Sequence, residues 1–514
     1  MEERKKYRGY LLSILFFFTL VRLLYIGTIP ISPDEAYYWS WSQKPAISYF
    51  DQPGMVAWVN WLFNHLPGAP SEFTVRLPAV ILMFFASIFS WGAYLEFSHK
   101  PKPAFFLAVG LNFIPIYFLS GLTMLHDTVL IFFLAGFYYF VLRLINQPAL
   151  KNWLGLGIFL LASLYSKLNA LWVGVGLAGY LVFTRPGRGY LKTPGPWLAG
   201  AINLFGFAPV LWWNYKNNFP HLLAIRQLTD SGKITLIKAL KHLGEYLGSQ
   251  FGVYSPLVML GIILSVLYAL KSLKKTRREK IPVLLFLSLP AQIYFLLLCI
   301  RSEVFGNWSL VGYFPLILLF CYFCFEEKKP LLTKKYYHLA IGLSALLCLG
   351  LAVEAKYRFA RALSWELKEK FHLERPLDWR LDQELEGWSE LVQAVEKHRK
   401  PDEVLSSRRY QIASVLQFYL AEHPEVVVIS AGHKKSQFNL WHHPRELAGK
   451  NVLYVDAKPM PHQVKKRFSR VIDLEAPLKI YRQGKLIKVF YLQRGINYHP
   501  KNPRIDKLNR KSLK

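Results

Sequence analysis

The residues best suited to chemistry are three carboxylic acids in a loop rich in Trp and Tyr. Asp34 and Glu35 lie side by side, and Asp51 follows after a short interval. The loop comes directly after residues 10–27, the first apolar run of membrane-spanning length. Ionisable groups at a bilayer boundary are costly to keep, so such a cluster indicates function. A carboxylate there can accept a proton from a hydroxyl, orient a substrate, or help to hold a divalent cation.

The composition indicates that this chemistry takes place at a membrane. Of 514 residues, 53% are hydrophobic and 16% are aromatic, which is too apolar for an ordinary soluble domain. Several apolar runs approach the ~20 residues that a helix needs to cross hydrocarbon. These runs are 10–27, 75–97, 104–120, 129–145, 197–213, 253–270, 281–300, 308–325 and 339–353. Residues 153–183 are too many for one span and are interrupted at Ser166–Asn169, which predicts two short helices and about eleven helices in total.

Basic residues predict the orientation of these helices. They gather in loops that alternate along the chain, at residues 4–8, 99–102, 185–192, 271–280 and 328–335. The positive-inside rule makes these loops cytoplasmic, together with the N-terminus. The loops that hold Asp34, Asp127, Lys167 and Arg301 are then outside, and so is the chain after Val353. The first run lacks a cleavage pattern and is expected to be retained as a helix.

A shift in composition near Glu354 predicts a domain boundary. Residues 1–353 form the predicted transmembrane catalytic domain, with an external loop at 29–73. Residues 354–498 alternate between helix-like and strand-like segments, which predicts an extracytoplasmic (periplasmic) α/β domain. Residues 499–514 form a basic tail that we expect to be disordered. All four cysteines lie in apolar runs, so the outer domain has to be held together without disulfides.

The start of the acidic loop has two readings. Ser32-Pro33-Asp34-Glu35 has the form of a capping box, so Glu35 serves either catalysis or the closure of a helix start. Asp34 has less structural reason to be there, although the helix dipole favours its ionised form in the first turn, and it is the stronger candidate. Tyr37 and Tyr38, with two nearby Trp residues, predict either an interfacial aromatic belt or a groove for a prenyl chain or sugar.

Further polar residues occur at the predicted outer ends of later helices. His126 and Asp127 precede one apolar run, and Lys167 interrupts another. Arg301 and Asn307 lie between two late runs. Each has a structural alternative: Asp127 as a helix cap, Lys167 as a snorkelling side chain, and Arg301 and Asn307 as interfacial anchors. His221 is expected to be an ordinary surface residue.

The acidic loop also resembles a known family. Asp34-Glu-Ala-Tyr-Tyr-Trp-Ser-Trp, followed by Tyr49-Phe-Asp-Gln-Pro-Gly-Met-Val-Ala-Trp, is similar to the first external loop of bacterial family 39-type glycosyltransferases. These are polytopic GT-C enzymes related to protein O-mannosyltransferases and to the lipid A aminoarabinose transferase. Further similar segments are His126-Asp127, Ser166-Lys167, Gly306-Asn-Trp308, 409–419 and 436–441. Relatives often carry a basic residue where this chain has Gln52, so this chain departs from the family pattern at that position.

The resemblance implies a GT-C fold and an inverting transfer of a sugar from a polyprenyl-phosphate donor on the outer membrane face. A prenyl phosphate leaves readily, so it needs charge neutralisation, which Lys167 and Arg301 would supply. Asp34 would be the base, although Asp51 and Asp127 remain alternatives. The predicted catalytic residues are Asp34, Asp127 and Glu35, and the predicted substrate-binding residues are Asp51, Lys167, His126, Tyr37, Tyr38, Arg301 and Asn307. No metal ligand set is predicted; a divalent cation held by the carboxylates stays an open alternative.

The expected acceptor is lipid A or lipopolysaccharide core in a bacterial inner membrane, so the expected partners are the lipid-linked donor, a glycolipid and membrane lipids. An excess of basic residues after Glu354 favours an anionic acceptor, or serves solubility alone. The alternative functions are a protein O-glycosyltransferase and a transporter or flippase of lipid-linked sugars. Transporters of that kind usually have repeated halves, and this chain has no internal repeat. No nucleic-acid motif occurs.

Overall fold

The computed structural model describes residues 1–500 except 69, 230, 231, 233, 274–279, 328, 377, 378, 431 and 433. The chain divides into two compact units. The first contains Met1–Gly27 and Ala46–Ala352, and the second contains Thr28–Pro45 and Val353–Lys514. The sequence predicted a division at 353/354, with the acidic loop in the first domain. In the structure, Thr28–Pro45 is instead part of the same unit as the C-terminal residues. The predicted basic tail lies outside the described residues from 501 onward, as do 274–279 and 328 of the predicted basic loops.

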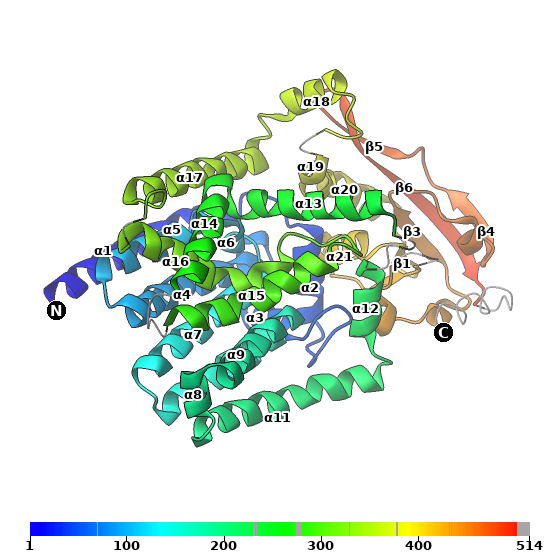
Figure 1. Cartoon of the computed structure of the whole chain (residues 1–514). Coiled ribbons are helices and arrows are strands. Elements are labelled where there is room, and N and C mark those ends of the chain that lie inside the picture. Colours follow the sequence, from blue (N-terminus) through cyan, green and yellow to red (C-terminus); the bar gives the residue numbers. More distant parts are fainter. Residues whose placement is uncertain are drawn as a thin grey trace. The chain divides into compact units, whose positions relative to one another are not determined.

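The first unit is helical (Figure 1). Its helices are α1 (Glu2–Ile26), α3 (Met55–Phe63), α4 (Glu72–Ser98), α5 (Pro101–Leu111), α6 (Pro115–Ser120), α7 (His126–Asn146), α8 (Leu150–Ser166), α9 (Leu171–Phe183), α10 (Arg185–Tyr190), α11 (Pro194–Lys216), α12 (Pro220–Thr229), α13 (Leu236–Tyr254), α14 (Pro256–Ser272), α15 (Lys280–Leu298) and α16 (Tyr313–Phe325). Two short 3₁₀ segments, η1 (Leu168–Ala170) and η2 (Trp308–Gly312), join them, and α17 (Lys334–Tyr357) leads into the second unit.

The described helices confirm a multi-pass membrane protein. Six of them are long and apolar enough to cross a membrane, or seven if the bent pair α13 and α14 is one span. The predicted break at Ser166–Asn169 is confirmed, because α8 ends at Ser166 and α9 begins at Leu171. The run 104–120 was predicted as one helix, but it divides into α5 and α6 before Pro115, which lacks the N–H needed to continue a helix. The predicted number of about eleven spans is not confirmed.

Close helix packing shapes the core of the first unit. Helix α7 contacts both α4 and α8, while α9 contacts α15. At the α9–α15 contact, a Cβ on Gly176 would lie 2.2 Å from the carbonyl oxygen of Phe286. Small residues let helix backbones approach in this way, which is a main source of helix association in membranes. This packing places the ends of α7, α8 and η2 in one region.

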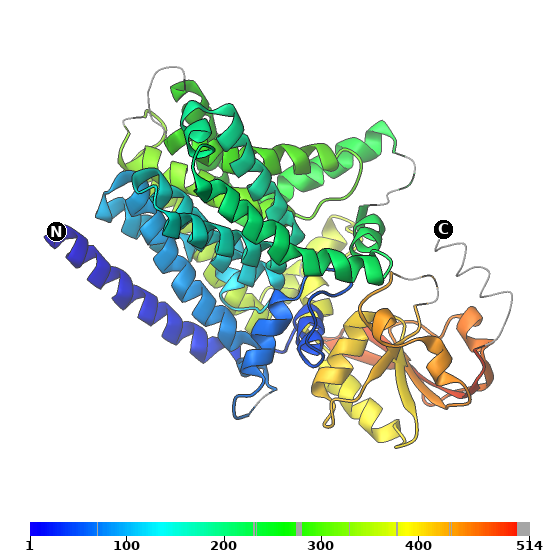
Figure 2. The same cartoon turned by 90° about the horizontal axis from the view of Figure 1, so that it is seen from below.

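The second unit is built on a six-stranded mixed sheet, coloured orange to red in Figure 2. Its strands are β1 (Val404–Ser407), β2 (Val426–Val428), β3 (Val452–Asp456), β4 (Phe468–Asp473), β5 (Leu478–Arg482) and β6 (Lys485–Tyr498). The order is β2-β1-β3-β6-β4, with β5 paired to β6. Strand β1 is parallel to β2 and β3, in a register that pairs Leu405 with Val426 and Leu453, and the remaining pairs are antiparallel. The strands lie within residues 354–498, the region in which the sequence predicts strand-like segments.

Further helices lie in the described part of the second unit. They are α2 (Pro33–Ser42), α18 (Arg361–Lys370), α19 (Trp379–Leu385), α20 (Trp388–His398), α21 (Tyr410–Tyr419), α22 (Phe438–Trp441), the 3₁₀ segment η3 (Pro444–Leu447) and α23 (His462–Lys465). Helix α2 packs on α21, although almost 400 residues separate them in the sequence. This pairing is what joins the acidic loop to the C-terminal part of the chain.

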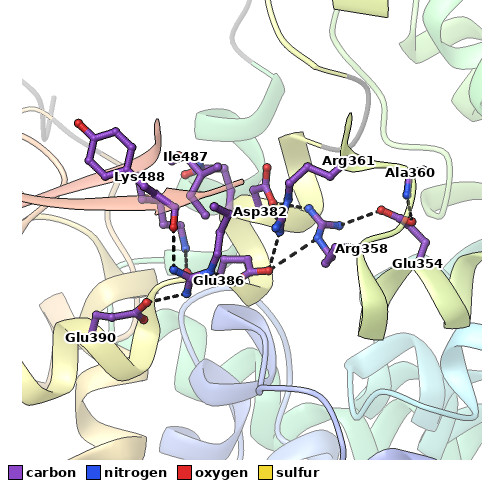
Figure 3. A network of polar contacts seen from close by, with 12 residues as sticks. Glu354, Arg358, Ala360, Arg361, Asp382, Glu386, Glu390, Ile487 and Lys488 are labelled. Atoms are coloured by element: carbon purple, nitrogen blue, oxygen red, sulfur yellow. Dashed lines mark hydrogen bonds and ion pairs between the residues drawn. The ribbon is translucent and has the colours of Figure 1, made fainter. Parts of the chain in front are cut away.

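A network of ion pairs joins the segment after α17 to α19 and to strand β5 of this sheet (Figure 3). Arg358 and Arg361 both contact Asp382, and Arg361 Nη2 lies 2.6 Å from Glu386 Oε1. Arg482 of β5 binds the other oxygen of Glu386 at 2.9 Å. Because each buried charge has an opposite partner, the network links α18, α19 and β5 without an unpaired ion.

Candidate active site

The N-terminus of α2 carries the capping box that the sequence predicted. The Ser32 hydroxyl accepts a hydrogen bond from the Glu35 amide at 3.3 Å, and Glu35 Oε2 accepts one from the Ser32 amide at 3.1 Å. Glu35 is fully buried. Its position is therefore explained by closure of the helix start, and its catalytic role stays a prediction.

Unlike the buried Glu35, the neighbouring residue Asp34 lies at the surface of the second unit. Its side chain is exposed, and Oδ1 accepts a hydrogen bond of 2.9 Å from the Tyr410 hydroxyl. Neighbouring protein atoms displace part of the water around the Asp34 carboxyl, and this desolvation raises its pKa. The hydrogen bond from Tyr410 and the positive charge of Arg380 act in the opposite direction. A raised pKa brings a carboxylate closer to the range in which it works as a general base.

Helix α21 holds the segment before Asp34 through three hydrogen bonds. Besides the bond from Tyr410, the Ser414 hydroxyl donates to the carbonyl of Pro33 at 3.1 Å. The Ile31 amide donates to the Tyr419 hydroxyl at 2.9 Å. Sequence reasoning missed these contacts. The only available signal was the similarity of residues 409–419 to the predicted family, which does not say what the helix touches.

The aromatic residues of α2 pack inside the second unit. Tyr37 is 2% exposed and Tyr38 7%, so neither forms the interfacial belt that was one of the two predictions. The rings of Tyr37 and Tyr410 are 4.3 Å apart, and the Tyr37 hydroxyl accepts a hydrogen bond from the Gln437 amide. The physical reason is the pairing of α2 with α21, which offers these rings a protein surface. Their role in binding a substrate stays a prediction.

A second group of predicted residues meets in the first unit, and we call it the Asp127 cluster. Lys167 Nζ lies 2.7 Å from Asp127 Oδ1, and Asn307 Nδ2 donates to Asp127 Oδ2 at 2.6 Å. His126 Nε2 lies 3.6 Å from the same Oδ2. The Lys167 and Asp127 side chains are 3% and 5% exposed. The structure thus brings together four of the residues that the sequence singled out.

Breaks in the helices bring the Asp127 cluster together. Helix α7 begins at His126, and α8 ends one residue before Lys167, which has extended backbone. Asn169 of η1 donates to the carbonyl of Trp308 at 3.0 Å, which joins η1 to η2 and to the neighbouring Asn307. Asp127 accepts bonds on both oxygens from fixed donors, so it suits the organisation of the site better than proton removal.

Asp51 lies in a tight turn of the first unit. The Tyr49 amide donates to the carbonyl of Gln52 at 3.0 Å, and the Gly54 amide donates to the carbonyl of Ile47 at 3.1 Å. A Cβ on Gly54 would lie 2.5 Å from the carbonyl oxygen of Ala46, so the turn requires glycine. Asp51 itself is half-buried.

Gln52, the residue at which the chain departs from the predicted family pattern, connects this turn to the Asp127 cluster. Its Oε1 accepts a hydrogen bond of 3.2 Å from the Leu168 amide, next to Lys167. A lysine could not accept this bond, because an ammonium group has only donors. The sequence alone identified the departure but not the contact.

His221 contradicts the prediction that it is a surface residue. It is 5% exposed, and its Nε2 lies 3.0 Å from both the Tyr49 carbonyl and the Ser48 hydroxyl. Asn214 Nδ2 lies 3.0 Å from its other ring nitrogen. Burial lowers the pKa of His221 to about 4, so the ring is neutral and can accept from Asn214 while it donates to Tyr49. His221 thus fixes the turn that carries Asp51.

Arg301 does not join either group. It lies after α15 with an exposed side chain. Within the described part of the chain, no group of three or more His, Cys, Asp or Glu residues is arranged to hold a metal ion. The second unit thus holds Asp34 with α21, and the first unit holds the Asp127 cluster and the Asp51 turn.

Solved structures identify the class of fold. The chain is similar to the crystal structure of ArnT from Cupriavidus metallidurans in the apo state, with a TM-score of 0.59 and 13% identity, over 94% of this chain and 98% of that one. It is also similar to the same protein bound to undecaprenyl phosphate, with a TM-score of 0.60, 12% identity and the same coverage. The fold is therefore the GT-C type that the resemblance implies, with helices long and apolar enough to cross a membrane and a further sheet domain.

Sequence comparisons point to the same group of proteins. The family model described as dolichyl-phosphate-mannose-protein mannosyltransferase matches residues 51–213. The chain is also similar to the lipid A galacturonosyltransferase RgtD of Rhizobium johnstonii. The two are 26% identical over 309 residues, and these residues are 59% of this chain. The match spans 63% of that relative, less than two thirds of its length. The resemblance stated from the first-loop motif is confirmed by these similarities.

Proposed function

We propose that this protein is an inverting glycosyltransferase that moves a sugar from a polyprenyl phosphate to lipid A or lipopolysaccharide core on the outer face of a bacterial inner membrane. The observation that carries the proposal is the Asp34 carboxylate, which is exposed at a helix start and oriented by Tyr410. The names of the similar proteins support the reactants, since one is a lipid A galacturonosyltransferase and another binds undecaprenyl phosphate. A uronic acid is accordingly our first candidate for the sugar.

In the proposed reaction, an acceptor hydroxyl attacks the anomeric carbon as its proton passes to Asp34. The bond between that carbon and the phosphate oxygen breaks, and the polyprenyl phosphate leaves with the bonding electron pair. Because the leaving group is already a stable anion, it needs cationic donors more than a general acid. Lys167 is our candidate for the cation that binds the leaving phosphate. An ammonium group has three donors, and Asp127 is the side-chain partner of Lys167 among the described residues, so donors remain for the phosphate.

A second candidate function is protein O-glycosylation. The observation that favours it is the family model over residues 51–213, which is described by a protein mannosyltransferase. The proposed chemistry at Asp34 is the same in both cases, because a seryl or threonyl hydroxyl also has to lose a proton. The two candidates differ only in the acceptor.

Mass spectrometry tests the proposal and separates the two acceptors. Lipid A, core oligosaccharide and envelope proteins are compared in a Gram-negative host with no protein, the wild type, Asp34→Asn, or the control Asp402→Asn. Asp402 is an exposed aspartate of the second unit. We expect an added uronic acid mass on the glycolipid with the wild type and the control, and none with Asp34→Asn. A sugar found only on proteins would replace lipid A by a protein acceptor, and unchanged transfer by Asp34→Asn would remove Asp34 as the base.

A further inference from the structure

The geometry of helix α21 extends the proposed function to Tyr410, a residue to which the sequence alone assigns no role. Tyr410, at the start of this helix, donates to Asp34 Oδ1 at 2.9 Å. Within the described part of the chain, Tyr410 is the side chain that donates a hydrogen bond to the Asp34 carboxylate. Among the described residues, no side chain donates a hydrogen bond to the second oxygen, Oδ2.

Tyr410 is itself held in place by its neighbours. Its ring lies 4.3 Å from that of Tyr37, and Tyr37 in turn stacks on Phe438 with an interplanar angle of 22°. The Tyr37 hydroxyl accepts a hydrogen bond of 2.7 Å from the Gln437 amide. A phenol whose ring is fixed on one side can donate in only a narrow range of directions, so it determines how the carboxylate is rotated.

The remaining bonds of α21 act on the backbone and not on the carboxylate. Ser414 binds the carbonyl of Pro33, and Tyr419 binds the amide of Ile31. One helix therefore positions the loop at two points and the reacting group at a third. This division provides a matched pair of tyrosines, because Tyr410 and Tyr419 lie on the same helix and only Tyr410 touches Asp34.

We infer that Tyr410 is a positioning residue, whose hydroxyl fixes the Asp34 carboxylate so that Oδ2 faces the acceptor hydroxyl. This inference rests on the proposed function, in which Asp34 is the base. It gives helix α21 an indirect part in the reaction, through a side chain that acts on Asp34 and not on the substrate.

The bond also affects the proton affinity of Asp34. A hydrogen bond to the ionised carboxylate stabilises that form, so its removal raises the pKa of Asp34 further. The other charged groups that act on Asp34 are Glu35 on its own helix and Arg380 on α19, and Glu384 on α19 interacts with Asp34 in turn. None of them changes in a Tyr410→Phe variant, so the shift can be assigned to the lost hydroxyl.

The test uses the full chain in detergent micelles, with undecaprenyl-phosphate-linked galacturonic acid and lipid A as the probes. We expect Tyr410→Phe to lower kcat by about 10–100-fold with little change in the KM of the donor, because the base is misoriented and donor binding is not affected. The acid limb of the pH profile should move to higher pH. Tyr419→Phe should keep the wild-type pH profile. Replacement of Tyr410 by fluorotyrosine, a stronger donor on the same ring, should move the acid limb to lower pH.

A second measurement reports on Asp34 without turnover. Carbodiimide modifies protonated carboxyl groups, so the pH midpoint of modification of the peptide that holds Asp34 should be higher in Tyr410→Phe than in the wild type. Thermal unfolding of each variant shows whether it is folded. Equal midpoints and equal kcat in Tyr410→Phe and the wild type would overturn the inference. Equal losses in both phenylalanine variants with unshifted profiles would also overturn it, in favour of a purely structural helix. Failure of the proposed function looks different, since Asp34→Asn would then keep its activity.

Discussion

Lys167 and Asp127 form an ion pair in which both side chains are almost completely removed from water. Removal of one partner from such a pair leaves a buried charge without compensation, which costs about 3–5 kcal/mol. We therefore expect Lys167→Met to lower the free energy of unfolding by about that amount. The double variant Lys167→Met with Asp127→Asn should recover part of the loss, because the uncompensated carboxylate is gone. Thermal unfolding in detergent measures all three variants. Strictly additive losses would contradict a direct pair.

Glu384 on α19 gives a prediction about pH. Burial raises the pKa of its carboxyl to about 7, and the nearby Asp34 charge adds to this effect. The unfolded chain releases this proton near its usual pKa of 4.5, so the contribution of Glu384 to stability falls as the pH rises from about 4.5 to 7. A Glu384→Gln variant has no carboxyl group at this position, so its stability does not fall for this reason as the pH rises.

The melting temperature of Glu384→Gln relative to the wild type should consequently rise between pH 5 and pH 8. A change of about 2–4 °C corresponds to about 1 kcal/mol in a domain of this size. Glu396→Gln, at an exposed position of α20, is the control and should keep a constant difference. A difference that does not change with pH for Glu384→Gln would contradict the assigned pKa.

At this scale the sequence is a good guide to local contacts and a poor one to distant contacts. The capping box of Ser32 and Glu35 could be predicted because both partners lie within one helical turn. The bond between Tyr410 and Asp34 could not, since 376 residues separate them and neither residue type requires the other. His221 was missed for the same reason, because its partners Ser48 and Tyr49 belong to a distant turn.

The contact between α9 and α15 yields a prediction about whole elements. A Cβ on Gly176 would meet the backbone of Phe286, whereas a Cβ on Gly174 has its closest neighbour 3.8 Å away. Gly176→Ala should force the helices apart and destabilise the protein by about 1–3 kcal/mol. Gly174→Ala, on the same helix, should be neutral or stabilising by up to about 1 kcal/mol, because alanine favours helix. Unfolding in detergent distinguishes them. Equal stability of the two variants would contradict the close approach.

Helices could be predicted from apolar runs, but their interruptions only in part. Lys167 revealed the break between α8 and α9, since a charged residue is costly inside a span. The break before Pro115 and the bend of 106° between α13 and α14 were not predicted. The apolar run 104–120 continues through the first break and the run 253–270 begins just before the second, so hydropathy marks neither break, although a proline follows in both cases.

For the molecule as a whole, the predicted orientation can be tested by thiol labelling. The four native cysteines are buried in the first unit, so background labelling should be low. Lys466→Cys, exposed in the second unit, should react with a membrane-impermeant maleimide in cells whose outer membrane alone is opened. Lys192→Cys, in a predicted cytoplasmic loop, should react only after the inner membrane is permeabilised. Labelling of both under the first condition would contradict the orientation.

The membership of Thr28–Pro45 in the second unit has a consequence for the time course of biosynthesis. A ribosome makes this segment early, but its partner helix α21 follows more than 300 residues later. At about 5–20 residues per second, the delay is roughly 15–70 seconds. Throughout that interval Trp39 and Trp41, both almost fully buried in the finished protein, lack the surface that covers them. The nascent chain therefore needs temporary shelter for these rings, from lipid or from a chaperone, until the last third of the polypeptide emerges.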